Sequence, residues 1–399
     1  MTTEHKRFFW ILTACFGLTL LPIFVLNLIL LKDALGNHQK TLQASQWQQR
    51  THGITFSTFA DEHLFKTLRL HDRMAEINTV VLGSSTAMGL SQQAFPEVLH
   101  VYNYAQSAHS LSAAIDEATW LMAETDNVKY LIMPLDWALG WIYINGKPAP
   151  TDLSAAAAMQ EVQSEAGIPL LDRMRDALTY PRIVNLMKIV KVIFNDKDAM
   201  VTFRFYFLQN SSDEYRCADG SLAKDFVITH RGSCAGIRFD GSATFANRRP
   251  VRDAQPLIDS ATELNTRYTG YLANRQGQPN PDFLRRLAGL ARQAEQKEGK
   301  LLLFMPPLLP GMENAFLKDV YLSAYLLRTK QILNDWAARE DIVIFDAGQS
   351  ERAGCAAIEF VDQEHALSGC YDKVFSRFWN THTRIQDGNI IWPPGGLYE

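Results

Sequence analysis

Two short segments, far apart in the sequence, carry side chains whose types could perform acyl transfer. The first is Gly83-Ser84-Ser85, which directly follows the apolar run TVVL. The second, near the other end of the chain, holds Asp362 and His365 three residues apart. A serine becomes a nucleophile when a histidine accepts its proton, and a carboxylate fixes the histidine tautomer and stabilises the protonated ring. These residue types predict Ser85 as nucleophile, His365 as general base and Asp362 as the orienting acid.

Each segment also has a purely structural interpretation. A Gly-Ser-Ser sequence after a strand is typical of a turn followed by a helix cap. An aspartate and a histidine three residues apart occur by chance in many sequences. The catalytic interpretation requires both segments to stand at the carboxyl edge of one sheet, where open α/β folds bind their ligands.

The elements that must position these segments follow from the hydrophobic pattern. Short apolar runs predict strands over residues 79–83, 99–104, 130–135, 300–305 and 341–345. Helical periodicity occupies the stretches between several of them. Short continuous apolar strands that alternate with helices indicate a parallel sheet covered on both faces. We therefore predict an α/β fold with a doubly wound, flavodoxin-like parallel sheet of about five strands.

A long segment between the third and fourth strands interrupts this alternation. Residues 140–280 are too many for a simple loop, and they predict an inserted subdomain of helices and loops. The predicted organisation is an anchor over 1–32, a stalk and lead-in over 33–75, and a domain over 76–399 that contains the insertion. Because the insertion leaves the carboxyl edge of the sheet, it could serve as a lid or as a partner surface.

The N-terminal region predicts a membrane anchor. Residues 8–31 carry no charged side chain and are long enough to span a bilayer as a helix. Lys6 and Arg7 precede this run and favour a cytoplasmic N-terminus. The alternative is a cleaved signal peptide, which would have a shorter apolar region and a small-residue cleavage site. We expect an uncleaved single-pass anchor in the inner (plasma) membrane and a globular domain on the periplasmic, extracytoplasmic side.

Cysteine usage fits an oxidising compartment. Cys15 lies within the apolar run, and the other four form two local pairs, Cys217 with Cys234 and Cys355 with Cys370. An even number outside the membrane favours disulfides, although four cysteines allow three pairings and free buried thiols are the alternative. No CxxC and no Cys/His spacing typical of zinc occurs, so we expect no metal ion and no cofactor. A net charge of −4 predicts no nucleic-acid partner.

Three short blocks resemble the SGNH/GDSL hydrolase superfamily. They are GSS after the first strand, NYAQSA (103–108) after the second, and D-x-x-H after the last. The resemblance covers about residues 79–135 and 300–378 and implies the same three catalytic residues. The anchor, the GSS form and the strand LLLFMPP are similar to membrane-anchored members that assist O-acylation of extracytoplasmic polymers. These include alginate and cellulose O-acetylation proteins and the D-alanine transfer protein of teichoic acids.

The resemblance also implies an oxyanion hole. Its donors would be the backbone N–H groups of Ser85 and of Ala105, which stands where the family has glycine, with help from Asn103. The family's third block supplies an asparagine, but this chain has MPLDW there, with Asp136 and Trp137 at its end.

Other side chains are candidates for the substrate cleft. Ser107, Asp136 and Trp137 are expected to line it; the tryptophan could stack on a sugar ring, although packing in the core or in a lid is the favoured alternative. His109 and Ser110 follow the second strand and are interpreted as a helix cap, with cleft lining by His109 as the alternative. Asp116 and Glu117 are interpreted as a solvated helix face.

The predicted function is a membrane-anchored serine acyltransferase or esterase that works through an acyl-serine. The resemblance implies O-acetylation, or deacetylation, of a cell-surface or exported polysaccharide, with a multi-span membrane O-acyltransferase as partner. The alternative is a catalytically silent adaptor with the same scaffold that binds a glycan or that membrane partner. The missing asparagine and the large insertion favour the adaptor, whereas the intact Ser85, Asp362 and His365 oppose it.

Overall fold

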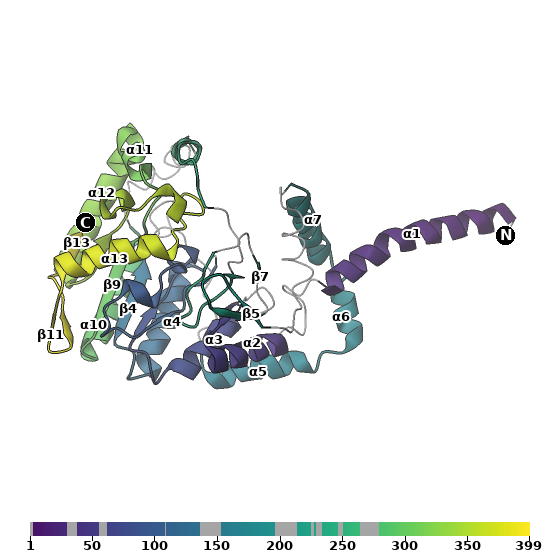
Figure 1. Cartoon of the computed structure of the whole chain (residues 1–399), viewed down its shortest axis with the longest axis horizontal. Helices are drawn as coiled ribbons and strands as arrows, with labels where there is room; N and C mark the ends of the chain where they lie inside the picture. The colour runs from purple at the N-terminus through teal and green to yellow at the C-terminus, as the bar shows by residue number, and fades with distance from the viewer. Residues whose placement is uncertain are drawn as a thin grey trace. The chain divides into compact units, whose positions relative to one another are not determined.

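The computed structural model is shown in Figure 1. It describes residues 3–29, 38–55, 62–107, 109–135, 153–195, 214–224, 227–228, 234–245, 250–263 and 279–399. The chain forms two compact units, Met1–Phe65 with Ala158–Gly236, and Lys66–Ala157 with Ile237–Glu399.

This division differs from the predicted one. Of the insertion predicted over 140–280, only 158–236 belongs to the first unit, and it shares that unit with the N-terminal residues. The chain from Ile237 onward belongs to the unit that contains the large parallel sheet, because backbone hydrogen bonds connect it to that unit. The Ala243 N–H, for example, donates to the carbonyl oxygen of Met88 at 2.7 Å. A run of mixed polarity gives no sign in the sequence of such long-range contacts.

The second unit is built on a six-stranded parallel sheet in the order β13-β10-β9-β4-β2-β3. Its strands are β2 (Thr79–Val81), β3 (Val101–Asn103), β4 (Tyr130–Pro134), β9 (Lys300–Met305), β10 (Val343–Asp346) and β13 (Gly396–Tyr398). The first five follow the flavodoxin-like order 2-1-3-4-5. Its switch point lies between β2 and β4, because β3 is added on one side of β2 and the next strands are added on the other side. The predicted α/β class and parallel sheet are confirmed, and each of the five predicted runs contains a strand, but the sheet has six strands rather than about five. β13 was missed, because its three residues carry no apolar run.

Helices α4 (Leu111–Glu124), α10 (Pro281–Gln296), α11 (Met312–Lys318), α12 (Val320–Glu340) and α13 (Ser368–His382) accompany this sheet. Their starts follow from local capping: the side chain of Asp319 accepts hydrogen bonds from the N–H groups of Tyr321 and Leu322, both at 2.9 Å. The connections also contain 3-10 turns η2 (Ser85–Ala87), η3 (Gln92–Ala94), η5 (Ser350–Ala353) and η6 (Ala357–Glu359), and the hairpin β11 (Arg384–Gln386) and β12 (Asn389–Ile391).

Aromatic packing attaches α13 to the centre of the sheet. Phe304 of β9 and Phe345 of β10 are register partners and therefore project from the same face. The ring of Phe375 on α13 lies 5.3 Å from Phe304 and 5.5 Å from Phe345, between ring centroids. All three side chains are buried. Burial of this size contributes about 2–3 kcal/mol per ring and holds α13, with the segment before it, against the sheet.

The first unit contains helices α1 (Thr3–Ile29), α2 (His38–Thr51), α6 (Leu170–Asp176) and α7 (Tyr180–Asn195). Its short strands are β1 (Ile54–Thr55), β5 (Tyr215–Arg216), β6 (Leu222–Lys224), β7 (Val227–Ile228) and β8 (Cys234–Ala235). Helices α3 (Glu62–Arg73) and α5 (Ala155–Ala166) contain the boundaries between the units. Within α1, His5–Asn27 is long and apolar enough to cross a membrane, with a mean hydropathy of 2.3.

The four paired cysteines form the two disulfides that their positions favoured. Cys217 is bonded to Cys234 in the first unit, and Cys355 to Cys370 in the second. Cys15 is a free, exposed thiol on α1. Two disulfides fit a domain in an oxidising compartment.

Candidate active site

Ser85 reaches the carboxyl edge of the sheet through a turn that only glycine can make. Gly83 has a φ of +138°, and a Cβ built there would lie 2.5 Å from the ring carbons of Pro134. After the turn, the Ser84 hydroxyl accepts a hydrogen bond from the Thr86 N–H at 3.3 Å and caps η2. Ser84 is therefore the capping residue, and Ser85 is the first residue of the 3-10 turn.

Three side chains meet at this edge. The Ser85 hydroxyl oxygen lies 2.8 Å from His365 Nε2, although the two residues are 280 positions apart. His365 Nδ1 lies 2.8 Å from each carboxylate oxygen of Asp362. The side chains of His365 and Asp362 are 12% and 28% exposed, so the arrangement is accessible from solvent without being fully hydrated. This is the hydrogen-bonded order that activates a serine nucleophile.

The segment carrying Asp362 and His365 is held by its own backbone bonds. One Asp362 oxygen accepts hydrogen bonds from the N–H groups of Glu364, at 3.1 Å, and His365, at 2.9 Å. The Val361 N–H donates to the His365 carbonyl at 3.0 Å, which closes a tight loop. Beyond the loop, the Tyr371 hydroxyl of α13 donates to the carbonyl oxygen of Thr86, which lies in η2, the turn that begins with Ser85. The two halves of the site are thus bonded directly to each other.

The pKa of the Asp362 carboxyl lies below its ordinary value. Burial is the largest single influence and opposes the charged form. It is outweighed by the hydrogen bond and the charge of His365 together with the N–H groups of Glu364 and His365. The carboxylate therefore stays ionised, as a group that stabilises an imidazolium must.

A pH dependence follows from this shift. The unfolded carboxyl titrates near pH 4, so these contacts stabilise the folded chain above about pH 4 and are lost as the pH falls through the lower folded-state pKa. The stability advantage of the wild type over Asp362→Asn should shrink as the pH drops below about 4. Urea unfolding at a series of acidic pH values measures it. An advantage that grows on acidification would contradict the assignment.

The predicted oxyanion donors differ in their availability. No hydrogen bond among the described residues uses the backbone N–H of Ser85. The Ala105 N–H, in contrast, donates to the side-chain oxygen of Asn103 at 2.9 Å. The Asn103 amide nitrogen donates to the carbonyls of Ala87 and Leu90, both at 2.8 Å, and its side chain is fully buried. In this structure Asn103 braces the turn that carries Ser85, and, of the backbone N–H groups of Ser85 and Ala105, that of Ser85 is the one not used by any described residue.

Lys66 supports the chain at the end of β3, around Asn103 and Ala105, and this role was not anticipated from the sequence. Its ammonium group is fully buried and donates to the carbonyl oxygens of Asn103 at 3.1 Å, Gly241 at 3.0 Å, and Ala105. A buried charge is tolerated where several oxygens coordinate it. In the sequence, the only indication of this role is that Lys66 lies in α3 among the apolar residues Phe65 and Leu68, which are buried.

Phe245 lies beside His365, and Glu117 forms part of a second histidine–carboxylate pair that follows the neighbouring strand β3. The ring of Phe245 meets the His365 ring edge-on, 6.1 Å between centroids, and Phe245 has a positive φ of +49°. A phenylalanine in this backbone region is strained, and such strain is common at functional sites. Glu117 is fully buried and accepts a hydrogen bond from His109 at 2.8 Å, which makes a second histidine–carboxylate pair after β3.

The helix cap expected from His109 and Ser110 is formed by Ser110, which caps α4 by accepting a bond from the Ala113 N–H at 3.1 Å. The interpretation of Glu117 as part of a solvated helix face was wrong. Glu117 lies on the buried face of α4, between Ala114 and Leu121 at helical spacing, and this pattern could have identified it.

The remaining cleft candidates are only partly placed. Ser107 is exposed just after β3, and its hydroxyl lies 3.6 Å from the sulfur of Met88. Asp136 and Trp137 lie outside the described residues. Within the described ranges, no group of three or more His, Cys, Asp or Glu side chains is placed to hold a metal ion.

Fold and site together define an α/β protein with a Ser-His-Asp arrangement at the carboxyl edge of a parallel sheet. Comparison with protein-family models, with curated proteins and with solved structures finds no match.

The disulfide between Cys355 and Cys370 closes a loop of 15 residues around Asp362 and His365. We expect replacing both cysteines by alanine to reduce stability by about 3 kcal/mol, because the unfolded chain regains the entropy that the loop had lost. The thermal unfolding midpoint should fall by roughly 6–12 °C. Cys15→Ala is the matched control and should leave the midpoint unchanged. Equal midpoints for all three proteins would show that packing alone holds the loop.

Proposed function

We propose that this protein is a membrane-anchored serine acyltransferase or esterase that acts through an acyl-serine. The observation that carries the proposal is the continuous hydrogen-bonded series from Ser85 through His365 to Asp362. The position of Ser85 after β2, at the switch point of a 2-1-3-4-5 sheet, supports it, because open α/β folds bind ligands there.

The geometry accounts for each proton. His365 Nε2 accepts the hydroxyl proton as the oxygen of Ser85 attacks the acyl carbonyl, and Asp362 stabilises the resulting imidazolium. The free N–H of Ser85 donates to the developing oxyanion. His365 then protonates the leaving group, and the acyl group remains on Ser85. In the second half, His365 accepts a proton from an acceptor hydroxyl or water, whose oxygen attacks the acyl carbonyl. The bond between the acyl carbon and the Ser85 oxygen then breaks, and His365 returns the proton to that oxygen, which restores the starting state.

Wider features of the chain support a proposal for the acyl acceptor and for the class of reaction. The resemblance to SGNH/GDSL proteins that act in polymer O-acylation leads us to propose an exported or cell-surface polysaccharide as acceptor. An apolar helix that can cross a membrane and two disulfides support an extracytoplasmic site beside the membrane. An anchored enzyme stays close to a membrane-embedded acyl donor, which favours transfer over hydrolysis and a multi-span O-acyltransferase as partner.

One observation favours a second candidate, a silent adaptor that binds a glycan or the membrane partner. The N–H of Ala105 and the amide of Asn103 are both engaged within the protein, so a single predicted donor is free for an oxyanion. Losing an oxyanion donor costs on the order of a hundredfold or more in turnover.

Covalent labelling separates the two candidates. The full-length protein in detergent, with its disulfides intact, is incubated with a fluorophosphonate probe, and the modified peptide is identified by mass spectrometry. The enzyme predicts a single modification at Ser85, absent in Ser85→Ala and retained in Ser376→Ala, an exposed serine on α13. A folded wild type that stays unmodified would establish the adaptor instead.

A further inference from the structure

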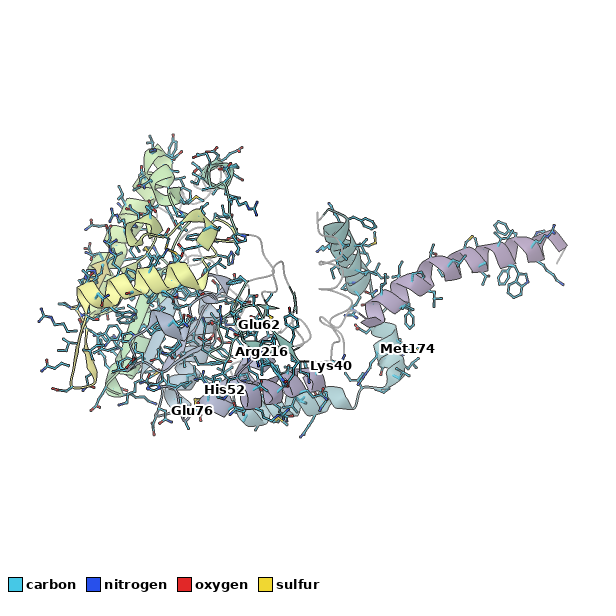
Figure 2. All side chains as sticks on the ribbon, in the orientation of Figure 1. Lys40, His52, Glu62, Glu76, Met174 and Arg216 are labelled. Carbon is cyan, nitrogen blue, oxygen red and sulfur yellow. A yellow bond between two sulfur atoms is a disulfide. The ribbon has the colours of Figure 1, made fainter. Side chains whose placement is uncertain are left out.

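Helices α6 and α7 of the first unit expose many large apolar side chains. On α6 these are Leu170, Leu171 and Met174, which are 72%, 57% and 39% exposed, and Leu178 follows at 47%. Met174, labelled in Figure 2, extends from α6. Within α6, spacings of three and four residues place Leu170, Leu171 and Met174 along one side of the helix. A water-soluble surface rarely carries so continuous an apolar stripe.

Helix α7 has two apolar faces rather than one. Its inner face carries Leu186 and Ile189, which are buried against Ile23 and Leu26 of α1. Its outer face carries Tyr180, Met187 and Phe194 at seven-residue spacing, exposed by 79%, 59% and 83%. The outer stripe comprises these three side chains of α7 together with Leu170, Leu171 and Met174 of α6 and the following Leu178. Packing on α1 leaves the outer stripe uncovered by any described residue of this unit.

The contact with α1 is at the end of the candidate membrane span. Besides Ile23 and Leu26, the Asn27 side chain donates to the Ala177 carbonyl at 2.9 Å, and Arg182 donates to the Asn27 carbonyl at 2.6 Å. The span His5–Asn27 has 23 residues, about 34 Å of helix, against a hydrocarbon thickness of about 30 Å. Helices bonded to its last turn therefore lie where the chain leaves the bilayer, whichever side that is.

The charges near the outer stripe fit a lipid surface. Lys188 and Lys191 are exposed on α7 beside Met187, and Arg175 is exposed on α6. Long basic side chains next to an apolar stripe keep their charge in water while their carbon chains cover apolar surface. A helix with apolar residues on one side and lysines beside them is typical of helices that lie in the interface of a membrane with anionic lipids.

We propose that α6 and α7 lie in the plane of the membrane surface, with the outer stripe inserted among the lipid headgroups and upper acyl chains. The proposal rests on α1 spanning the membrane, which is part of the proposed function. The protein then contacts the bilayer through one crossing helix and one in-plane helical pair bonded to it. The shared contact of Asn27 with Ala177 and Arg182 fixes the two parts to each other.

The test places a fluorophore at single cysteines of the full-length protein in vesicles of phosphatidylcholine and phosphatidylglycerol. Met187→Cys and Phe194→Cys, each with Cys15→Ser, carry the label on the outer stripe. Gln46→Cys, exposed on α2 and also combined with Cys15→Ser, is the matched control, and native Cys15 in the otherwise unchanged protein reports on the span. Lipids with a doxyl quencher near the headgroup or near the chain end measure depth, and iodide in solution measures exposure to water.

We expect the headgroup-level quencher to act on labels at positions 187 and 194 at least about twofold more than on Gln46→Cys, and the deep quencher to act most on Cys15. Iodide should quench Gln46→Cys most. Quenching of Cys15 without quenching at 187 and 194 would overturn the inference and keep the anchor. Labels at 187 and 194 shielded from both lipid and iodide would place a protein partner or a second copy on the stripe, which also overturns it. Absence of quenching at Cys15 would overturn the anchor as well.

Discussion

Replacing His365 by alanine is expected to lower the turnover of an activated ester such as p-nitrophenyl acetate by at least about a thousandfold. The Ser85 hydroxyl oxygen lies 2.8 Å from His365 Nε2, and no other described residue forms a hydrogen bond with that hydroxyl. Without the imidazole, the serine keeps its proton at neutral pH and is a weak nucleophile. Steady-state kinetics on the purified full-length protein measures the loss.

Three further variants make this result specific. Ser85→Ala should lose as much as His365→Ala, and the double variant should lose no more than either, because the two residues act as a unit. His382→Ala removes a histidine at the end of α13 and should keep the wild-type rate. Turnover that survives in both Ser85→Ala and His365→Ala would assign any esterase activity to another site and remove the basis of the acyl-serine proposal.

Gly83→Ala should destabilise the sheet unit by roughly 4 kcal/mol, from two sources of comparable size. A φ of +138° is a backbone conformation that side chains with a Cβ avoid, at a cost of about 1–3 kcal/mol. The added methyl would also lie 2.5 Å from the ring carbons of Pro134, and crowding in a packed core costs about 1–3 kcal/mol. The thermal unfolding midpoint should fall by roughly 8–16 °C. Turnover should fall too, because Ser85 stands two residues further on.

Gly354→Ala separates the two sources. Gly354 also has a positive φ, +81°, but a Cβ built there meets no atom within 4 Å. This variant should therefore show only the backbone cost, about 1 kcal/mol. If Gly83→Ala were no more destabilising than Gly354→Ala, the close approach of Pro134 would not constrain the turn, and Gly83 would owe its place to φ alone.

The central strands could be predicted from the sequence because their environment is uniform. In β9, Leu301 to Met305 are at most 1% exposed, and a strand buried on both faces must be apolar at every position. β13 has no such signature: Gly396 to Tyr398 form an edge strand that pairs with β10 alone. The division into two units depends on which distant segments pack together, and a local sequence pattern does not carry that information.

The nucleophile and its partners could be proposed from residue type and from their places after strands. The supporting residues could not, because their roles depend on contacts between distant segments. Lys66, for example, acts on carbonyls up to 175 positions away, and Phe245 reaches His365 from a loop that carries no recognisable motif. Asn103 was expected to face an oxyanion, but the structure uses its amide to hold the turn.

By itself, the sequence determined the apolar helix at the N-terminus, the α/β class and the residues able to do chemistry, because hydrophobic period and side-chain type are local properties. Only the tertiary structure decided that Ser85 and His365 stand 2.8 Å apart, because strands distant in the chain end at one edge of the sheet. It also decided which N–H groups remain available to a ligand and which ones, such as the Ala105 N–H, form hydrogen bonds within the protein. Those outcomes depend on the competition among hydrogen-bonding groups in a buried space, where most N–H groups are paired.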